Sequence, residues 1–197
     1  MNITQIEAAA ARLQGHARVT PLLSSPFLDE IAGRRVFVKA ECLQHTGSFK
    51  YRGAYSALSA LATETRAQGV IAFSSGNHAQ GVAYAARQHG VPAVIIMPSD
   101  APKLKIANTR AYGAEVVLYD RATEDRDAIG DALARERGLT LIKPFDNAEV
   151  IAGQGTIGME LLRQQSGPIH AIFVPVGGGG LISGIALYVK YLRPEIK

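Results

Sequence analysis

Short apolar runs alternate along the chain with longer, alanine-rich stretches of helical character. The apolar runs are rich in β-branched residues and predict strands at 35–40, 69–74, 92–98, 114–120, 139–144 and 170–176. The alanine-rich stretches predict helices near 48–63, 77–89, 102–111, 123–137, 155–165 and 180–192. Because the strands are apolar on both faces, we expect parallel sheets covered by helices on both sides. The alternation predicts an α/β fold of the doubly wound, open parallel-sheet type.

The N-terminal stretch MNITQIEAAAARLQ predicts an amphipathic helix that starts with a capping box from Thr4 to Glu7. It lacks the apolar core of a signal peptide, and no later segment approaches the length of a membrane span. The single cysteine, Cys42, excludes an internal disulfide and a Cys-rich zinc site, which favours a reducing compartment. We therefore expect a cytoplasmic protein with no membrane contact.

The composition is that of a packed globular protein. Of the 197 residues, 47% are hydrophobic and 19% are charged, which argues against disorder. The net charge is +4, and the lysines and arginines are scattered rather than clustered. This distribution argues against a nucleic-acid partner and is compatible with small anionic ligands. The five histidines are dispersed without metal-ligand spacing, so we expect no metal site among these residues.

Four consecutive glycines, Gly177–Gly180, end the last apolar run and open the last predicted helix. Glycines allow left-handed backbone conformations that turn successive N–H groups inward, and the dipole of the following helix favours a bound anion. The alternative is a plain flexible turn, for which four glycines would be a needless entropic cost. A P-loop is excluded because no Gly-Lys-Ser/Thr follows. We therefore expect a nest for an anion.

A second glycine motif, GQGTIG at 153–158, matches the G-x-G-x-x-G pattern literally. No clear strand precedes it, and no acidic residue stands about twenty positions later at a strand end, so we expect no dinucleotide site. We interpret the motif as a tight turn into a helix.

The segment SSGNHAQG, which begins at Ser74, leads from a predicted strand into a helix. Ser75, Gly76 and Asn77 offer a hydroxyl, backbone N–H groups and an amide at a helix N-terminus, which suits a carboxylate or an oxyanion. Serine and asparagine are also the usual helix N-caps, and the sequence alone leaves both interpretations open. We interpret His78 as structural.

Lys50 lies in HTGSFKYRGA at the start of a predicted helix, between Phe49 and Tyr51 and with few acidic residues nearby. The alternative is a solvated surface lysine, the usual state of this residue. A helix N-terminus and a partly desolvated pocket both lower the pKa of a lysine, which makes the amine a nucleophile suited to an aldehyde. A reactive lysine, an anion nest and a carboxylate receptor together indicate an aldehyde cofactor bearing a phosphate, with an amino acid as substrate.

Four motifs occur in the order TGSFKYRGA, SSGNHAQGVA, VIAGQGTIGMELL and VPVGGGGLISG. Together with the connecting segment MPSDAPKLKIANTRAYGAEVVLYDR, they resemble the fold-type II pyridoxal-phosphate enzymes, in the branch of threonine and serine dehydratases and serine racemases. The resemblance covers essentially the whole chain and implies the tryptophan-synthase-β-like architecture. The sulfhydrylase branch and threonine synthase carry different motifs at these places and fit less well.

The resemblance implies a role for each motif. Lys50 would hold pyridoxal phosphate covalently and act as general base at the substrate α-carbon. Phe49 would lie beside the cofactor ring, and Asn77 would bind the phenolic oxygen. The cofactor phosphate would be bound by the backbone N–H groups of Gly177, Gly178, Gly179, Gly180 and Leu181. The substrate carboxylate would be bound in a pocket formed by Ser48, Ser75, Gly76, Asn77 and His78.

The implied reaction is β-elimination on a small L-hydroxyamino acid, namely threonine, serine or 3-hydroxyaspartate, to a 2-keto acid and ammonia. Ser75 favours an alternative, because threonine dehydratases commonly carry alanine there, whereas racemases and 3-hydroxyaspartate dehydratases carry serine. Its hydroxyl can face the α-carbon from the side opposite Lys50, so the two groups would serve as the acid and base of a racemase. Arg126 lies where serine racemases carry a functional arginine, although a solvated helix face explains it equally well. A non-catalytic amino-acid-binding module is a third hypothesis.

The same resemblance divides the chain. Residues 51–146 would form the small domain, and residues 1–50 and 147–197 would form part of the large cofactor-binding domain. In this family the large domain continues beyond LYVKYLRPEIK, so we expect an N-terminal portion of a longer protein that forms a homodimer when complete. The strand predicted at 170–176 would lack its usual cover. We expect little or no turnover from these residues alone.

Overall fold

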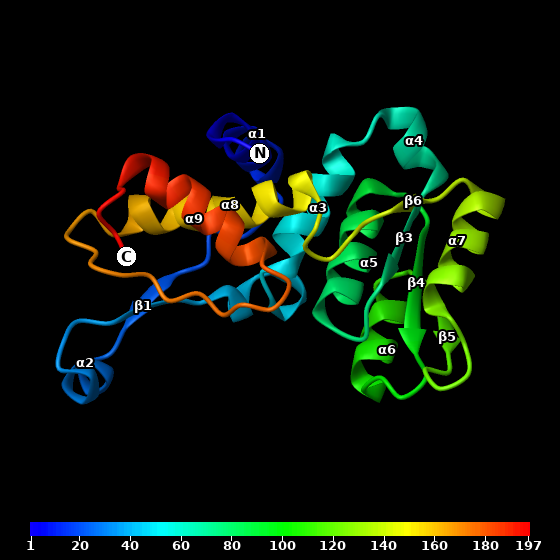
Figure 1. The fold of residues 1–197 in the computed structure, drawn as a ribbon, viewed down its shortest axis with the longest axis horizontal. Helices are drawn as coiled ribbons and strands as arrows, with labels where there is room; N and C mark the ends of the chain where they lie inside the picture. The colour runs from blue at the N-terminus through cyan, green and yellow to red at the C-terminus, as the bar shows by residue number, and fades with distance from the viewer.

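The computed structural model covers residues 1–197 and contains two regions of different architecture (Figure 1). One region is a four-stranded parallel sheet with helices on both faces. The other is a group of packed helices beside a small two-stranded sheet. The α/β class and the parallel sheet predicted from the sequence are confirmed.

The four-stranded sheet has the order β5–β4–β3–β6, and every neighbouring pair is parallel. Each of its strands lies inside a range predicted from the sequence. They are β3 (Val70–Phe73), β4 (Ala93–Pro98), β5 (Glu115–Tyr119) and β6 (Thr140–Leu141).

Alternate residues of the central strands enter two different cores. Val70 and Ala72 in β3 pack into the core shared with α3 and α5, whereas Ile71 packs into the core shared with α7. This double cover explains why the strands are apolar at every position. On the sheet, α5 (Asn77–His89) and α6 (Lys103–Ala111) cover one face and α7 (Arg126–Arg137) covers the other (Figure 1).

The second region is centred on α8 (Ala148–Gln164), which packs against α1 (Ile3–Leu13), α3 (Lys50–Ala60) and α9 (Gly180–Leu192) (Figure 1). The GQGTIG motif lies inside α8, so its interpretation as a tight turn into a helix is wrong. Its glycines allow neighbouring helices to approach closely.

Two contacts show how close the approach is. A Cβ atom at Gly153 would lie 2.6 Å from the carbonyl oxygen of Arg52 in α3. A Cβ atom at Gly184 in α9 would lie 2.6 Å from the backbone nitrogen of Gly155. The glycines of α8 therefore serve helix packing.

The N-terminal helix has a capping box, but not the predicted one. Asn2 caps α1 and Gln5 completes the box, because the helix begins before Thr4 and places Thr4 and Glu7 inside it. Five short elements were not predicted from the sequence, and two of them are one-turn 3-10 helices. They are β1 (Leu22–Ser24), α2 (Pro26–Ala32) and α4 (Thr63–Gln68), together with η1 (Glu41–Leu43) and η2 (His45–Gly47). β1 pairs antiparallel with β2 (Phe37–Lys39), which lies inside a predicted range.

No strand forms at 170–176, so this prediction is wrong. A strand needs a continuous ladder of hydrogen bonds to a neighbour. Here the backbone pairs only with Lys197, which accepts from Ile172 N–H at 2.9 Å and donates to the His170 carbonyl at 3.0 Å. Ile172 and Val174 pack on the core between α8 and α9, whereas Phe173 is 94% exposed.

The structure also bears on two broader expectations. No helix combines the length and the apolar character that crossing a membrane requires. Nowhere do three His, Cys, Asp or Glu side chains converge in a way that could hold a metal ion.

Candidate active site

A cavity of about 310 Å³ lies where the start of α3 meets the glycine-rich segment before α9. It is lined by Phe49, Lys50, Pro144, Phe145, Gln154 and residues 175–182. The cavity therefore brings the two strongest chemical signals of the sequence, the lysine and the glycine run, into one place.

Lys50 is the first residue of α3, as the sequence predicted. Its Nζ donates a hydrogen bond to the Pro144 carbonyl oxygen at 2.7 Å and lies 5.3 Å from the centre of the Phe49 ring. No carboxylate pairs with it. Burial lowers the pKa of the Lys50 amine below the ordinary 10.5. A larger fraction of the amine is therefore neutral, the form that attacks an aldehyde or accepts a proton.

The glycine run Gly177–Gly180 lines the same cavity. Gly179 has a left-handed backbone with φ of 87°, and Gly180 is the first residue of α9. A Cβ atom at Gly178 would overlap the ring of Phe145, so this position requires glycine. The N-terminus of a helix of this length presents free N–H groups and a positive dipole end, which suit an anion. Leu181 follows in the first turn and also lines the cavity.

The segment Ser75–Asn77 lies at the start of α5 but does not line this cavity. Gly76 is the N-cap of α5 and has no side chain to cap it, so the interpretation of this segment as a side-chain cap is wrong. Ser74 Oγ accepts from Gly76 N–H at 3.1 Å instead. The amide oxygen of Asn77 accepts a hydrogen bond from Lys105 in α6.

His78 is buried, and its Nε2 is 2.8 Å from the Ile142 carbonyl oxygen. A carbonyl only accepts, so Nε2 carries the proton. Burial, assisted by the nearby charge of Lys50, lowers the pKa of His78 from 6.5 to about 4. The imidazole is therefore neutral near pH 7, which suits the structural role predicted for it.

Arg126 lies away from the cavity. It is the first residue of α7, and its guanidinium is exposed, pairs with Asp127 at 3.4 Å and lies 5.9 Å from the Phe73 ring centre. Sequence reasoning missed several residues of the cavity wall, among them Phe145 and Gln154. Gln154 lies in the GQGTIG motif, which was the available signal, whereas nothing in the residue type of Phe145 marked it.

Three polar atoms around Lys50 are buried without hydrogen-bond partners. They are Ser48 Oγ, His78 Nδ1 and Gln154 Oε1. Buried polar atoms without partners are rare in proteins unless a ligand or water satisfies them. The site therefore has unused hydrogen-bonding capacity next to a reactive amine.

A half-buried lysine beside a glycine-rich anion nest, on a doubly wound α/β scaffold, defines a class of enzyme that holds an aldehyde cofactor with a phosphate group. The chain belongs to the family described as pyridoxal-phosphate dependent enzymes, whose model matches residues 13–197.

Individual relatives show which members of the family are similar. The chain is 55% identical over 187 residues to an L-threo-3-hydroxyaspartate ammonia-lyase from Pseudomonas sp. The aligned residues make up 95% of this chain and 58% of the relative. It is 50% identical over 181 residues to a biosynthetic L-threonine dehydratase from Pasteurella multocida (strain Pm70), covering 92% of this chain and 35% of the relative. The structure of maize serine racemase matches with a TM-score of 0.96 and 41% identity, covering 100% of this chain and 59% of that one. The chain thus spans less than two thirds of each of them.

The residues present fit pyridoxal phosphate. The Lys50 amine suits the aldehyde carbon, and the N–H groups of Gly177–Gly180 suit the phosphate. Phe49 lines the same cavity and offers an aromatic face. The unpartnered Oε1 atom of Gln154 belongs to a residue that lines the cavity, where a ligand with a polar group would contact it.

Proposed function

We propose that this protein is a pyridoxal-phosphate-dependent ammonia-lyase that performs β-elimination on a small L-hydroxyamino acid. The substrate class is threonine, serine or 3-hydroxyaspartate, and the products are a 2-keto acid and ammonia. The observation that carries the proposal is the placement of Lys50 and the glycine run in one cavity. The similarity to an L-threo-3-hydroxyaspartate ammonia-lyase and to a threonine dehydratase supports this reaction over others.

When bound, pyridoxal phosphate supplies an electron sink for the charge that develops at the substrate α-carbon. Lys50 would hold its aldehyde carbon, and Gly177–Gly180 with Leu181 would hold its phosphate. Phe49 would flank the ring, and Asn77 would contact the phenolic oxygen. Lys50, Asn77 and Gly180 are each the first residue of a helix. The backbone N–H groups of a first helical turn have no partner within the helix and can contact a ligand.

Lys50 Nζ would then remove the proton from the substrate α-carbon as the general base. Because burial lowers its pKa, the released amine is ready to accept the proton from the substrate α-carbon. Loss of that proton and of the β-hydroxyl removes one water. The resulting enamine takes up a water and releases ammonia, so the net change is hydroxyamino acid to 2-keto acid and ammonia.

The substrate carboxylate is the remaining charge to be bound. The start of α5 offers the backbone N–H groups of Ser75, Asn77 and His78, while the Gly76 N–H donates to Ser74 Oγ. Ser48, buried beside Lys50 with an unpartnered hydroxyl, would complete this pocket.

Racemisation of an amino acid is the second candidate, because the chain superposes closely on maize serine racemase. In that reaction Ser75 Oγ would exchange the α-proton on the face opposite Lys50. The change Ser75→Ala distinguishes the two, since it removes racemisation and leaves elimination of the L-substrate.

We propose further that residues 51–146 form the small domain and that residues 1–50 and 147–197 belong to the large domain. All four parallel strands lie within 51–146, which supports this division. The resemblance to the family favours a homodimer, and the single cysteine favours the cytoplasm.

The deciding experiment compares the protein with Lys50→Ala. Pyridoxal phosphate added to the parent should produce a visible absorption band that borohydride reduction fixes to Lys50, and the variant should show neither. Because we expect little or no turnover from these residues alone, cofactor attachment is the primary readout. Any keto acid formed from L-serine, L-threonine or L-threo-3-hydroxyaspartate should require Lys50. Equal cofactor attachment in parent and variant would refute the proposal.

A further inference from the structure

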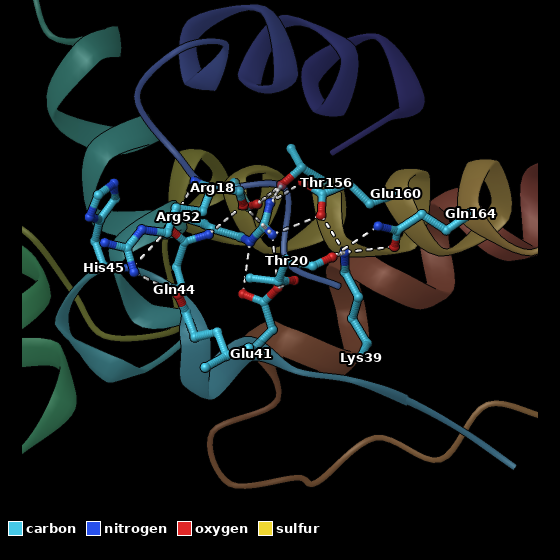
Figure 2. Close-up of polar contacts among 12 residues, drawn as sticks. Arg18, Thr20, Lys39, Glu41, Gln44, His45, Arg52, Thr156, Glu160 and Gln164 are labelled. Atoms are coloured by element: carbon cyan, nitrogen blue, oxygen red, sulfur yellow. Dashed lines mark hydrogen bonds and ion pairs between the residues drawn. The ribbon is translucent and has the colours of Figure 1, made fainter. Parts of the chain in front are cut away.

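Where α3 meets α8, four charged side chains form a largely buried group (Figure 2). Arg52 lies at its centre and its side chain is 1% exposed. Arg52 contacts Glu41 and Glu160, and Glu160 also pairs with Lys39. We call these four residues the Arg52 cluster. Nothing in the proposed reaction uses it.

Arg52 is held by two forked contacts. Its Nε and Nη2 donate to the two carboxylate oxygens of Glu41, each at 2.8 Å. Its Nη1 and Nη2 donate to the two oxygens of Glu160 at 2.6 and 2.9 Å. Two forked contacts fix both the position and the plane of a guanidinium group, which a single ion pair does not.

The partners of Arg52 are themselves held by groups distant in sequence. Thr20 Oγ1 donates to Glu41 at 2.6 Å, and the Thr20 carbonyl accepts from Lys39 Nζ at 2.7 Å (Figure 2). Arg52 Nη2 also donates to the Arg18 carbonyl at 3.1 Å. Glu41 begins a one-turn helix after β2, whereas Glu160 lies in α8. The cluster therefore joins α3, α8 and the N-terminal segment at one point.

The position of Arg52 on α3 relates this anchor to the lysine. Residues of an α-helix are about 100° apart around the axis, so Lys50 and Arg52 point about 200° apart. Lys50 faces the cavity and Arg52 faces Glu41 and α8. A rotation of the first turn of α3 would move the amine away from Gly177–Gly180. The forked contacts of Arg52 oppose that rotation.

The cluster acts through geometry rather than charge. Its two cations and two carboxylates leave no net charge beside the active site. Burial alone accounts for the lowered pKa of Lys50. Changing the cluster in a charge-balanced way should therefore alter where the amine points without altering the local field.

We propose that Arg52 is a positioning residue that aims the Lys50 amine at the aldehyde of pyridoxal phosphate bound on the glycine run. The proposal rests on the proposed function, since it assigns a role within the same site. The alternative is that the Arg52 cluster only stabilises the fold. Reaction at Lys50 and global stability must therefore be measured separately.

The measurement is the capture of Lys50 by pyridoxal phosphate. The full chain is incubated with the cofactor and reduced with borohydride, and the modified peptides are quantified by mass spectrometry. The ratio of capture at Lys50 to capture at exposed Lys143 is the readout, because a general change in reagent or protein moves both. The parent should favour Lys50 strongly. A parent ratio near one would refute the proposed function, and the positioning role with it.

Three variants separate position from stability. Arg52→Met with Glu41→Gln removes one cation and one carboxylate, so no unpaired charge is left behind. It should lower the capture ratio about tenfold, since a displacement of about 1 Å is enough for such losses. Arg52→Lys keeps the charge but loses the fork, and should lower the ratio about threefold. This single change keeps the test available if the double variant does not fold.

The control is the Arg12–Glu149 ion pair, which joins α1 to α8 away from the cavity. Arg12→Met with Glu149→Gln is also charge-balanced and should leave the capture ratio unchanged. Unfolding by urea is measured for every variant. A folded Arg52 variant with the parent ratio would overturn the positioning role, and so would an equal fall in the Arg12 control.

Discussion

The change Gly153→Ala tests whether α8 and α3 are in backbone contact. A Cβ atom at this position would lie 2.6 Å from the Arg52 carbonyl oxygen and 2.8 Å from the Cα atom of Gly53. Both neighbours are backbone atoms, so neither can move aside by changing a rotamer. The two helices must separate to accept the methyl group.

The magnitude follows from two opposing terms. Replacing glycine by alanine inside a helix stabilises it by about 1 kcal/mol through helix propensity. Overpacking of a closely packed core costs about 1–3 kcal/mol, and three backbone contacts below 3.0 Å place Gly153 at the upper end. We therefore expect the free energy of unfolding to fall by about 2 kcal/mol.

Gly158 in the same helix is the matched control. A Cβ atom there would lie 3.2 Å from the Ile185 carbonyl oxygen and 3.3 Å from a methyl group of Val189, distances that a small adjustment relieves. Propensity and packing should nearly cancel, so Gly158→Ala should change stability by less than about 0.5 kcal/mol.

Urea unfolding followed by circular dichroism measures the difference. With a slope of about 2 kcal/mol per molar urea, the midpoint of Gly153→Ala should fall by about 1 M at unchanged slope. A midpoint equal to or above that of the parent would show that α3 and α8 are not packed this closely.

The remaining predictions concern the cavity and its pH dependence. Because His78 has a pKa of about 4 when folded and 6.5 ordinarily, the unfolded chain binds more protons between these values. The free energy of unfolding should therefore decrease by up to about 3 kcal/mol as pH falls from 6.5 to 4. His78→Gln should remove this pH dependence, and an unchanged pH profile in the variant would contradict its assignment to His78. Gly178→Ala should weaken binding of pyridoxal phosphate about tenfold, measured by absorbance titration, because the methyl group would overlap the ring of Phe145. Adding Phe145→Ala should restore affinity, and continued weak binding would exclude this overlap as the cause. Since burial lowers the pKa of Lys50, its capture by the cofactor should reach half its maximal rate below pH 10.5, and a midpoint at or above that value would show a solvated amine.

The elements around the four-stranded sheet could be predicted well from the sequence. Strands such as Val70–Phe73 are short apolar runs bounded by polar residues, and the helices that follow begin where those runs end. The strand at 170–176 was predicted on the same pattern but does not form, because a strand also requires a neighbour with which to pair. Pairing depends on other parts of the chain, which a local pattern does not describe.

The interpretation of the GQGTIG motif as a tight turn was wrong for a related reason. Glycines usually mark turns, whereas Gly153 and Gly155 lie inside α8 and serve contacts with three other helices. Lys50 and the glycine run were found because each carries its own local signal. Arg52 was missed as a candidate because its meaning depends on Glu41 and Glu160, which only the fold brings to it.

The Arg52 cluster also restricts how this sequence can change over evolutionary time. Removing Arg52 alone leaves Glu41 without its cation, and removing Glu160 alone leaves Lys39 without its carboxylate. An unpaired buried charge commonly costs about 3–5 kcal/mol. Substitutions that leave stability unchanged must therefore replace charged partners together, even though Glu41 and Glu160 are far apart in the chain. We expect Lys39, Glu41, Arg52 and Glu160 to vary as a coupled set among relatives, while the exposed pair of Arg121 and Asp100 varies one residue at a time.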